Sequence, residues 1–333
     1  MAEGAPPPLD PAIAGFIRAG QIARFERIHA HDQLLRLTLN TSDGGHTEAL
    51  LSGVPSSAPG QLAVLMFHPD PIGASMYDPV LDAVQSRLTP LDVLSMRFAF
   101  RTSKLDDYSE MQFHSHKLDA VAAVDALLGR CGPAPRLLIV AESYGCWVAA
   151  DLLLDPPAMR GVRPEALVLI SPVTLAALEP MAPFGRLQAA LRAFTPPALF
   201  LAGEHDALSP PRRLRTALPV ADGAAPPSYR IIAGAGHYYT EGGRAAPDAP
   251  TRTAAAAAAA VAEFAARTFA STSGLRAGRA PGALDTLVFE EVTRDPGLQS
   301  LAGPSTAVRL LPLLAAVVTA RTRVRLNRLA FVL

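Results

Sequence analysis

The 333-residue sequence contains little cysteine, few charged residues and no excess of either charge. Its two cysteines, Cys131 and Cys146, cannot form a disulfide framework, which favours a reducing, cytoplasmic setting. The N-terminus lacks a basic segment followed by an apolar run, so we expect no secretory signal peptide. Lysine and arginine together number 30, as do aspartate and glutamate, and no overall field therefore favours nucleic acid or an anionic surface.

Motifs for binding phosphate, metal and nucleic acid are also missing from the sequence. No glycine-rich loop is followed by Lys-Ser or Lys-Thr, the pattern that holds nucleotide phosphates. His114 and His116 lie close together, but no cluster of cysteines or carboxylates supports a metal site there, and a polar loop or helix start is the simpler interpretation. Basic residues are not interleaved with aromatic ones, so nucleic acid is not an expected partner.

Half of the residues are hydrophobic, which is enough to form a large buried core. Continuous apolar runs, typical of strands buried on both faces, alternate with segments of helical periodicity. This alternation predicts an α/β fold with a mostly parallel central sheet and helices on both faces. The expected strands of this sheet cover residues 62–67, 92–100, 137–141, 166–170, 198–202 and 229–232.

An N-terminal extension is expected over residues 1–30, where the apolar spacing of residues 13–28 predicts a short amphipathic helix. The α/β domain itself is expected to span residues 31–270. It should open with two edge strands, at residues 34–39 and 47–51. Asp43-Gly44-Gly45 between these strands is a turn signal, which favours an antiparallel hairpin.

The alanine-rich residues 251–270 are predicted to form the last helix of the domain. Residues 271–333 are a C-terminal extension to which the sequence assigns no fold. Its uncharged apolar run, residues 310–320, is much shorter than the roughly 20 residues of a membrane-spanning helix. We expect a packed or disordered tail here, with membrane contact as the weaker alternative because four arginines follow the run.

The strongest functional signal lies in residues 137–150, LLIVAESYGCWVAA. An apolar run turns through a small-x-Ser-x-Gly pentapeptide and continues as an alanine-rich helical sequence. Strand, sharp turn and helix in this order are typical of a nucleophile elbow, which would hold Ser143 at strained backbone angles. The small residues Ala141 and Gly145 would avoid clashes in such a turn. Taken alone, the segment could also be an ordinary βα turn that contains a serine.

Two further polar residues follow later strands and complete a possible catalytic triad. Asp206 comes after the strand at residues 198–202, and His237 follows the next strand on a glycine-containing loop. A serine hydroxyl needs a base to take its proton, and the base needs an acid to orient it. Ser143 is therefore the predicted nucleophile, His237 the base and Asp206 the acid, in the chain order Ser-Asp-His.

Each of these residues has a structural alternative. Asp206 could be only a helix N-cap, with Ser209-Pro210-Pro211 competing for that role, and Glu204 is a rival acid two residues away. His237 could be an ordinary surface histidine. Cys146, which follows the elbow, is interpreted as a small buried residue of the helix and not as a nucleophile.

Acyl transfer through a serine also needs two backbone N–H groups to stabilise an oxyanion. Tyr144, the residue after the predicted nucleophile, is expected to supply one of them. The second is expected in the loop that begins at His68, where the two prolines have no N–H. Asp70 is therefore the preferred donor and Ile72 the alternative, while His68 is interpreted as a structural residue at the strand end.

Four separated segments of the chain resemble α/β-hydrolases, in particular small serine hydrolases related to dienelactone hydrolases. Residues 68–76 (HPDPIGASM) are similar to a His-Pro-His-Pro…Gly-Gly-Ser-Met loop, and residues 97–101 (RFAFR) to an Arg-Phe-Asn-Phe-Arg segment. Residues 203–206 (GEHD) and 234–239 (GAGHYY) resemble the segments that carry the acid and the histidine. The resemblance spans about residues 60–270.

This resemblance implies an α/β-hydrolase fold, a serine nucleophile, and no metal or organic cofactor. It implies ester or related acyl substrates, and it favours Asp206 over Glu204 as the acid. Asp70, Ala74 and Ala99 depart from the family pattern, as do residues 102–105. Because these positions line the mouth of the site, the resemblance implies nothing about substrate range.

The sequence thus predicts a serine hydrolase whose partner is a small-molecule acyl substrate. The alternative is a catalytically silent α/β-hydrolase fold used for binding or scaffolding. The altered loops motivate that alternative, whereas the complete set of serine, aspartate and histidine argues against it.

Overall fold

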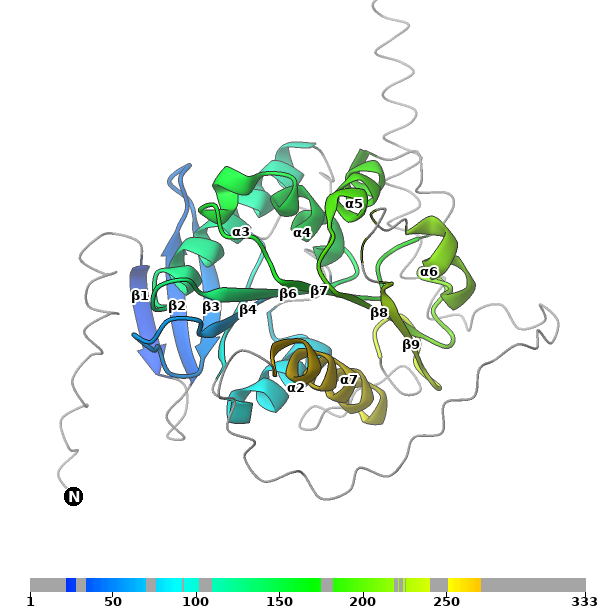
Figure 1. Cartoon of the computed structure of the whole chain (residues 1–333). Coiled ribbons are helices and arrows are strands. Elements are labelled where there is room, and N and C mark those ends of the chain that lie inside the picture. The colour runs from blue at the N-terminus through cyan, green and yellow to red at the C-terminus, as the bar shows by residue number, and fades with distance from the viewer. Residues whose placement is uncertain are drawn as a thin grey trace, which may run out of the picture. The chain divides into compact units, whose positions relative to one another are not determined.

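A computed structural model describes residues 22–27, 34–69, 76–91, 93–101, 110–174, 182–218, 221, 224, 226–239 and 251–270. All of them belong to one compact unit of the chain. Within this described part, nine strands form a single sheet in the order β1-β2-β3-β5-β4-β6-β7-β8-β9 (Figure 1). The strands are β1 (Ile22–Arg27), β2 (Leu34–Asn40), β3 (His46–Ser52), β4 (Leu62–Phe67), β5 (Leu94–Phe98), β6 (Arg136–Glu142), β7 (Ala166–Ile170), β8 (Ala198–Gly203) and β9 (Ser228–Ile232).

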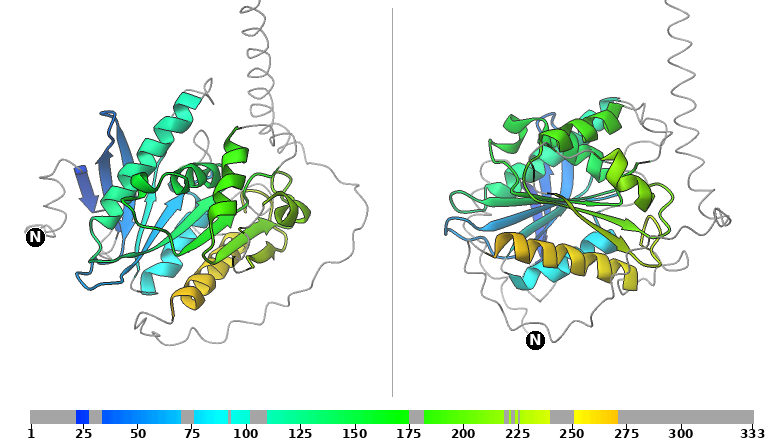
Figure 2. Two further views of the ribbon diagram at one scale, coloured as in Figure 1. Left: turned by 45° about the horizontal axis from the view of Figure 1, so that its top comes forward. Right: turned by 45° about the vertical axis from the view of Figure 1, so that its right-hand side comes forward.

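Helices cover both faces of this sheet. The helices α2 and α7 lie together on one face, and α3, α4 and α5 lie on the other (Figures 1 and 2). Two short 3-10 helices, η1 and η2, follow α2 and α4 in the chain. The bounds of the helical elements are α2 (Pro79–Leu88), η1 (Thr89–Leu91), α3 (Glu110–Leu128), α4 (Gly145–Leu153), η2 (Pro156–Met159), α5 (Ala182–Ala193), α6 (Pro211–Ala217) and α7 (Arg252–Phe269).

In the sheet order, the neighbouring strands β5, β4, β6, β7, β8 and β9 pair in parallel. The pairs β1–β2, β2–β3 and β3–β5 are antiparallel. Every residue of β4, β5, β7 and β8 is buried, as continuous apolar runs covered on both faces should be. The prediction of an α/β fold with a mostly parallel sheet and two helical layers is therefore confirmed. Parallel pairing also brings the carboxyl ends of these strands to one edge of the sheet.

The predicted hairpin is present, as β2 and β3 pair antiparallel through a turn at residues 41–45. The Thr41 N–H donates to the Gly45 carbonyl over 3.0 Å, and the Gly44 N–H donates to the Thr41 carbonyl over 3.0 Å. These are not edge strands, however, because β3 also pairs with β5 and β2 also pairs with β1.

The predicted helix over residues 13–28 is wrong for residues 22–27, which form strand β1. This strand pairs antiparallel with β2, placing Phe25 opposite Leu37. The reason is non-local: the open side of β2 presents backbone N–H and C=O groups that another strand can satisfy. The sheet thus begins at Ile22, ahead of the start at residue 31 that we expected for the domain.

The predicted last helix is confirmed as α7, and its N-terminus is capped by Thr251. The Thr251 hydroxyl accepts the Ala254 N–H over 3.1 Å, satisfying one of the backbone donors that a helix start leaves unpaired. Small buried residues, among them Ala254, Ala257 and Ala258, let α7 pack closely beside α2 and the sheet. Its remaining anchors are larger apolar side chains such as Val261 and Phe264.

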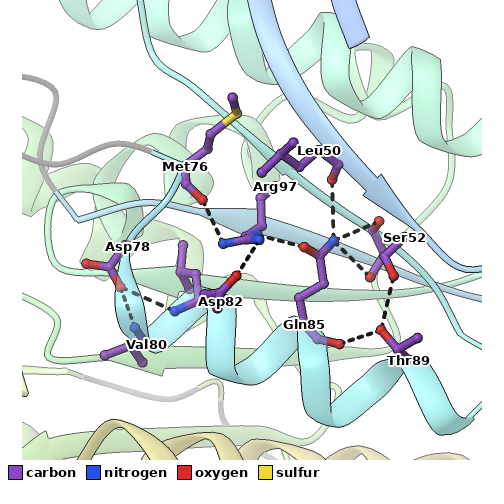
Figure 3. Close-up of polar contacts among 11 residues, drawn as sticks. Leu50, Ser52, Met76, Asp78, Val80, Asp82, Gln85, Thr89 and Arg97 are labelled. Atoms are coloured by element: carbon purple, nitrogen blue, oxygen red, sulfur yellow. Dashed lines mark hydrogen bonds and ion pairs between the residues drawn. The ribbon is translucent and has the colours of Figure 1, made fainter. Parts of the chain in front are cut away.

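A buried arginine ties the start of α2 to the sheet (Figure 3). The Arg97 guanidinium on β5 donates to the Gln85 Oε1 over 2.7 Å and to the Met76 carbonyl over 2.9 Å. It also donates to Asp82 over 2.7 Å. Because the Gln85 amide in turn donates to the Leu50 carbonyl over 3.3 Å, the network joins β3, β5 and α2. This network holds in place the helix that starts beside the carboxyl edge of the sheet.

The C-terminal extension, residues 271–333, lies outside the described residues, and so does its apolar run. The part of the N-terminal extension that precedes Ile22 also lies outside them. In the portion of the chain that the structure describes, no helix is long and apolar enough to cross a membrane.

Candidate active site

The predicted nucleophile elbow has the expected backbone geometry. Strand β6 ends at Glu142, helix α4 begins at Gly145, and Ser143 between them has a φ of 47°. A positive φ is strained for a residue with a side chain and is maintained only where the surrounding structure imposes it. Here the Ser143 N–H donates to the Ile170 carbonyl over 2.9 Å, which fixes the turn against β7.

Gly145 lets the elbow approach the end of β4. A Cβ atom at this position would lie 2.7 Å from the Phe67 carbonyl oxygen and 2.8 Å from the His68 carbonyl oxygen. Both distances are shorter than real Cβ contacts, and both atoms belong to the backbone. The sequence pattern therefore requires a small residue two positions after Ser143 because the elbow packs closely against the end of the neighbouring strand.

The structure brings Ser143, His237 and Asp206 together although they are far apart in the chain. The Ser143 Oγ lies 2.7 Å from the His237 Nε2. On the other side of the imidazole, Nδ1 lies 2.9 Å from one Asp206 carboxylate oxygen and 3.0 Å from the other. All three residues are buried. A hydroxyl, an imidazole and a carboxylate linked in this order form the hydrogen-bonded chain that activates a serine.

The Asp206 carboxylate is stabilised as an anion by several partners. Burial opposes its ionisation and by itself would raise its pKa, but the charge of His237 and the hydrogen bonds that it receives hold the pKa below its usual value. The Leu208 and Ser209 N–H groups donate to its Oδ1 over 2.9 Å and 2.7 Å. Asp206 does not cap the next helix, since α6 is preceded by Pro210 and has no side-chain cap.

The rival acid, Glu204, lies elsewhere. Its Oε2 accepts the Gly234 N–H over 2.8 Å, and its side chain is 46% exposed. Glu204 therefore braces the loop after β9, and it is the Asp206 carboxylate that contacts the His237 ring.

The two predicted oxyanion donors have different outcomes. Asp70 lies outside the described residues, as does the alternative donor Ile72. The Tyr144 N–H lies at the elbow as expected, but it donates to the Pro69 carbonyl over 3.0 Å. An oxyanion can bind to this N–H only after that carbonyl has moved away. His68, at the end of β4, accepts the Phe100 N–H on its Nε2 over 2.9 Å, in keeping with a structural role.

The Tyr144 side chain is held by a histidine whose role the sequence did not indicate. The Nδ1 of His116 lies 2.8 Å from the Tyr144 hydroxyl, and its Nε2 lies 3.2 Å from the Arg101 carbonyl. Burial lowers the pKa of His116 to about 4, so its ring is neutral at pH 7. His114 is exposed whereas His116 is buried. Among the described residues, no group of three or more histidines, cysteines or carboxylates could hold a metal ion.

Two further residues surround the candidate triad. Ser171, at the end of β7, also has a φ of 47°, hydrogen-bonds the Asp206 carboxylate and contacts the Tyr239 hydroxyl over 3.2 Å. No sequence motif marked it, because its importance depends on where β7 lies in the sheet. Cys146 is fully buried, its thiol directed at the Ala141 carbonyl over 3.3 Å. Burial raises the pKa of this thiol well above its usual value, which agrees with its interpretation as a packing residue.

The sequence matches no protein-family model, and no curated protein is similar to it at a significant level. Solved structures, in contrast, are similar in fold. Est1E from Butyrivibrio proteoclasticus superposes with a TM-score of 0.52 at 14% identity, over 72% of this chain and 100% of its own. An arylesterase superposes with a TM-score of 0.52 at 12% identity, over 79% of this chain and 99% of its own.

The chain has the α/β-hydrolase fold. The α/β-hydrolase sheet explains why Ser143, Asp206 and His237 meet: each follows a different strand of the parallel part, at the carboxyl edge. At these levels of identity the similarity extends to the fold alone, so activity has to be argued from the residues of the site.

Proposed function

We propose that this protein is a serine hydrolase that cleaves an ester or a related acyl bond through an acyl-enzyme intermediate. The observation that carries the proposal is the continuous chain of contacts from the Ser143 hydroxyl through the His237 ring to the Asp206 carboxylate. A buried chain of this kind has no evident structural purpose at a strained turn, whereas it is what an activated serine requires.

In the proposed reaction, the Ser143 Oγ attacks the acyl carbonyl while the His237 Nε2 takes the hydroxyl proton. His237 then gives this proton to the leaving group, which departs and leaves an ester on Ser143. A water molecule, deprotonated by the same nitrogen, hydrolyses that ester. Asp206 accepts the Nδ1–H hydrogen bond throughout, which fixes the tautomer of the ring and stabilises the imidazolium.

The oxyanion of each tetrahedral intermediate is proposed to bind the N–H groups of Tyr144 and Asp70. In this structure the Tyr144 N–H donates to the Pro69 carbonyl. The Pro69 carbonyl therefore has to turn away when substrate binds. The rearrangement exchanges one acceptor for another on the same N–H. A negatively charged oxygen is the stronger acceptor of the two, and this difference favours the exchange.

The alternative function is binding without catalysis, and one observation favours it. An N–H group already occupied by a backbone carbonyl does not stabilise an oxyanion, so a protein locked in this arrangement would hold acyl ligands without turning them over.

Labelling with a fluorophosphonate probe separates the two functions. The phosphonyl group reacts with an activated serine and mimics the tetrahedral intermediate, so it tests nucleophile, base and oxyanion site together. We expect wild-type protein to be labelled and Ser143→Ala to be unlabelled. The matched control is Ser86→Ala on the exposed side of α2, which should label as wild type does. Folded wild-type protein that stays unlabelled would establish the non-catalytic alternative.

A further inference from the structure

Glu142, the residue directly before the proposed nucleophile, is a fully buried carboxyl group. Side chains alternate along a strand, so Glu142 points to the same face of β6 as Leu138 and Val140, the face that packs against α2 and α7. Among the described residues, no N–H or hydroxyl group donates a hydrogen bond to either of its carboxylate oxygens. An ionised carboxylate in such a place would lack all the stabilisation that water provides.

Its neighbour on this face is another carboxyl group, Asp78, whose charge acts directly on Glu142. Asp78 is the N-cap of α2: its Oδ1 accepts the N–H of Val80 over 2.8 Å, the contact drawn in Figure 3, and the N–H of Leu81 over 3.2 Å. The positive charge of Arg97 also acts on it. Two buried carboxyl groups in contact do not both ionise, because each charge opposes the other.

The proton of this pair belongs on Glu142. Burial raises the pKa of both groups, but Asp78 has two backbone donors and a nearby cation to stabilise its charge, whereas no described residue supplies either to Glu142. Burial and the charges of Asp78 and Asp206 together raise the pKa of Glu142 well above its usual value. Among the described residues, the Cys146 thiol and the Tyr239 phenol also lie within electrostatic reach of Glu142; burial raises the pKa of both, so they remain neutral.

We propose that Glu142 is a positioning residue that stays protonated and donates a hydrogen bond to the Asp78 carboxylate, tethering the nucleophile elbow to the start of α2. The proposal rests on the proposed function in that it takes Ser143 as the nucleophile. The tether has two consequences. It holds the residue before a strained turn, and it keeps a negative charge away from the place where the oxyanion forms beside Ser143.

Two substitutions at this position separate positioning from simple packing. Glu142→Gln keeps a donor for Asp78 and cannot ionise, so it should retain most of the wild-type rate of fluorophosphonate labelling. Glu142→Ala removes the tether and should lower the maximal labelling rate on the order of 100-fold, with little change in the half-saturating probe concentration. Equal losses in both variants, or full activity in Glu142→Ala, would overturn the positioning role.

An infrared difference spectrum locates the proton without relying on activity. Wild type minus Glu142→Gln, recorded at neutral pH, should show the carbonyl stretch of a protonated carboxyl group. Carboxylate bands in its place would mean that Glu142 is ionised, and the proposal would be wrong. The labelling and infrared experiments also distinguish failure of the proposed function from failure of the inference about Glu142. Unlabelled wild-type protein would remove the proposed function and the positioning role with it, while a carboxylate spectrum in a labelled enzyme would remove only the inference about Glu142.

Discussion

At the scale of single residues, the acid of the proposed triad is chosen by its surroundings. Asp206 and Glu204 stand two positions apart after the same strand, and sequence alone gives both the chemistry of an orienting acid. In the structure, Asp206 is buried against the His237 ring, whereas Glu204 is half-exposed and bonded to a loop N–H. Orientation of an imidazole needs a fixed, desolvated partner, and only Asp206 is placed to be one.

We therefore expect Asp206→Asn to lower the rate of serine labelling and of ester turnover by about 10⁴-fold, because an amide favours the wrong tautomer of His237. The matched control is Glu204→Gln, whose amide oxygen can still accept the Gly234 N–H and which should keep the wild-type rate. Rate constants measured for the two purified variants check this prediction. A large loss in Glu204→Gln together with a mild one in Asp206→Asn would reverse the assignment of the acid.

At the scale of elements, the elbow depends on how closely α4 approaches β4. The Phe67 and His68 carbonyl groups occupy the space that a side chain at position 145 would need. Phe67 is the last residue of a buried strand paired on both sides and His68 follows it directly, so these backbone atoms cannot give way as a flexible side chain would. The same close approach sets where Ser143 lies relative to the end of β4.

Gly145→Ala should accordingly destabilise the protein by about 1–3 kcal/mol through overpacking and should slow serine labelling by displacing the elbow. Gly185→Ala in α5 is the matched control, because a Cβ atom there meets nothing within 4 Å. In that exposed helical position alanine should raise stability by up to about 1 kcal/mol. Urea unfolding of both variants gives the comparison, and equal midpoints would contradict the packing argument.

At the scale of the whole molecule, the described sheet starts earlier in the chain than the parallel core does. Strand β1 covers the outer side of β2, which would otherwise present unpaired backbone groups to solvent. At the other end of the described chain, α7 completes the layer that α2 begins. The residues of the proposed triad follow β6, β8 and β9, which all belong to the parallel part of the sheet.

Two truncations test this division of the chain. Residues 22–270 contain a nine-stranded sheet with helices on both of its faces, so we expect them to fold by themselves: removing residues 271–333 should leave the melting temperature and the serine labelling unchanged. Removing residues 1–30 deletes β1, and the exposed edge of β2 should lower the melting temperature and promote aggregation. Thermal unfolding and size-exclusion chromatography measure both effects. A loss of folding on removing residues 271–333 would show that the α/β domain needs its C-terminal extension.

Much of this protein could be predicted from local sequence patterns. Continuous apolar runs identified the buried strands, and a small-x-Ser-x-Gly turn between strand and helix identified Ser143. The strand-end positions of Asp206 and His237 followed from the same patterns. These features are readable because hydrophobic periodicity and turn chemistry act over a few neighbouring residues, and because parallel strands bring their carboxyl ends to one edge.

Other features depend on residues that are distant in the sequence, and only the tertiary structure decided them. Backbone pairing with β2 makes residues 22–27 a strand in spite of their helical spacing. The contact of the Tyr144 N–H with the Pro69 carbonyl arises where α4 meets the end of β4. The proposed protonation of Glu142 depends on burial and on Asp78, which lies at the start of a helix from another part of the chain. Hydrogen bonding and desolvation act through space, so their outcome is settled only when the packed fold determines which groups meet.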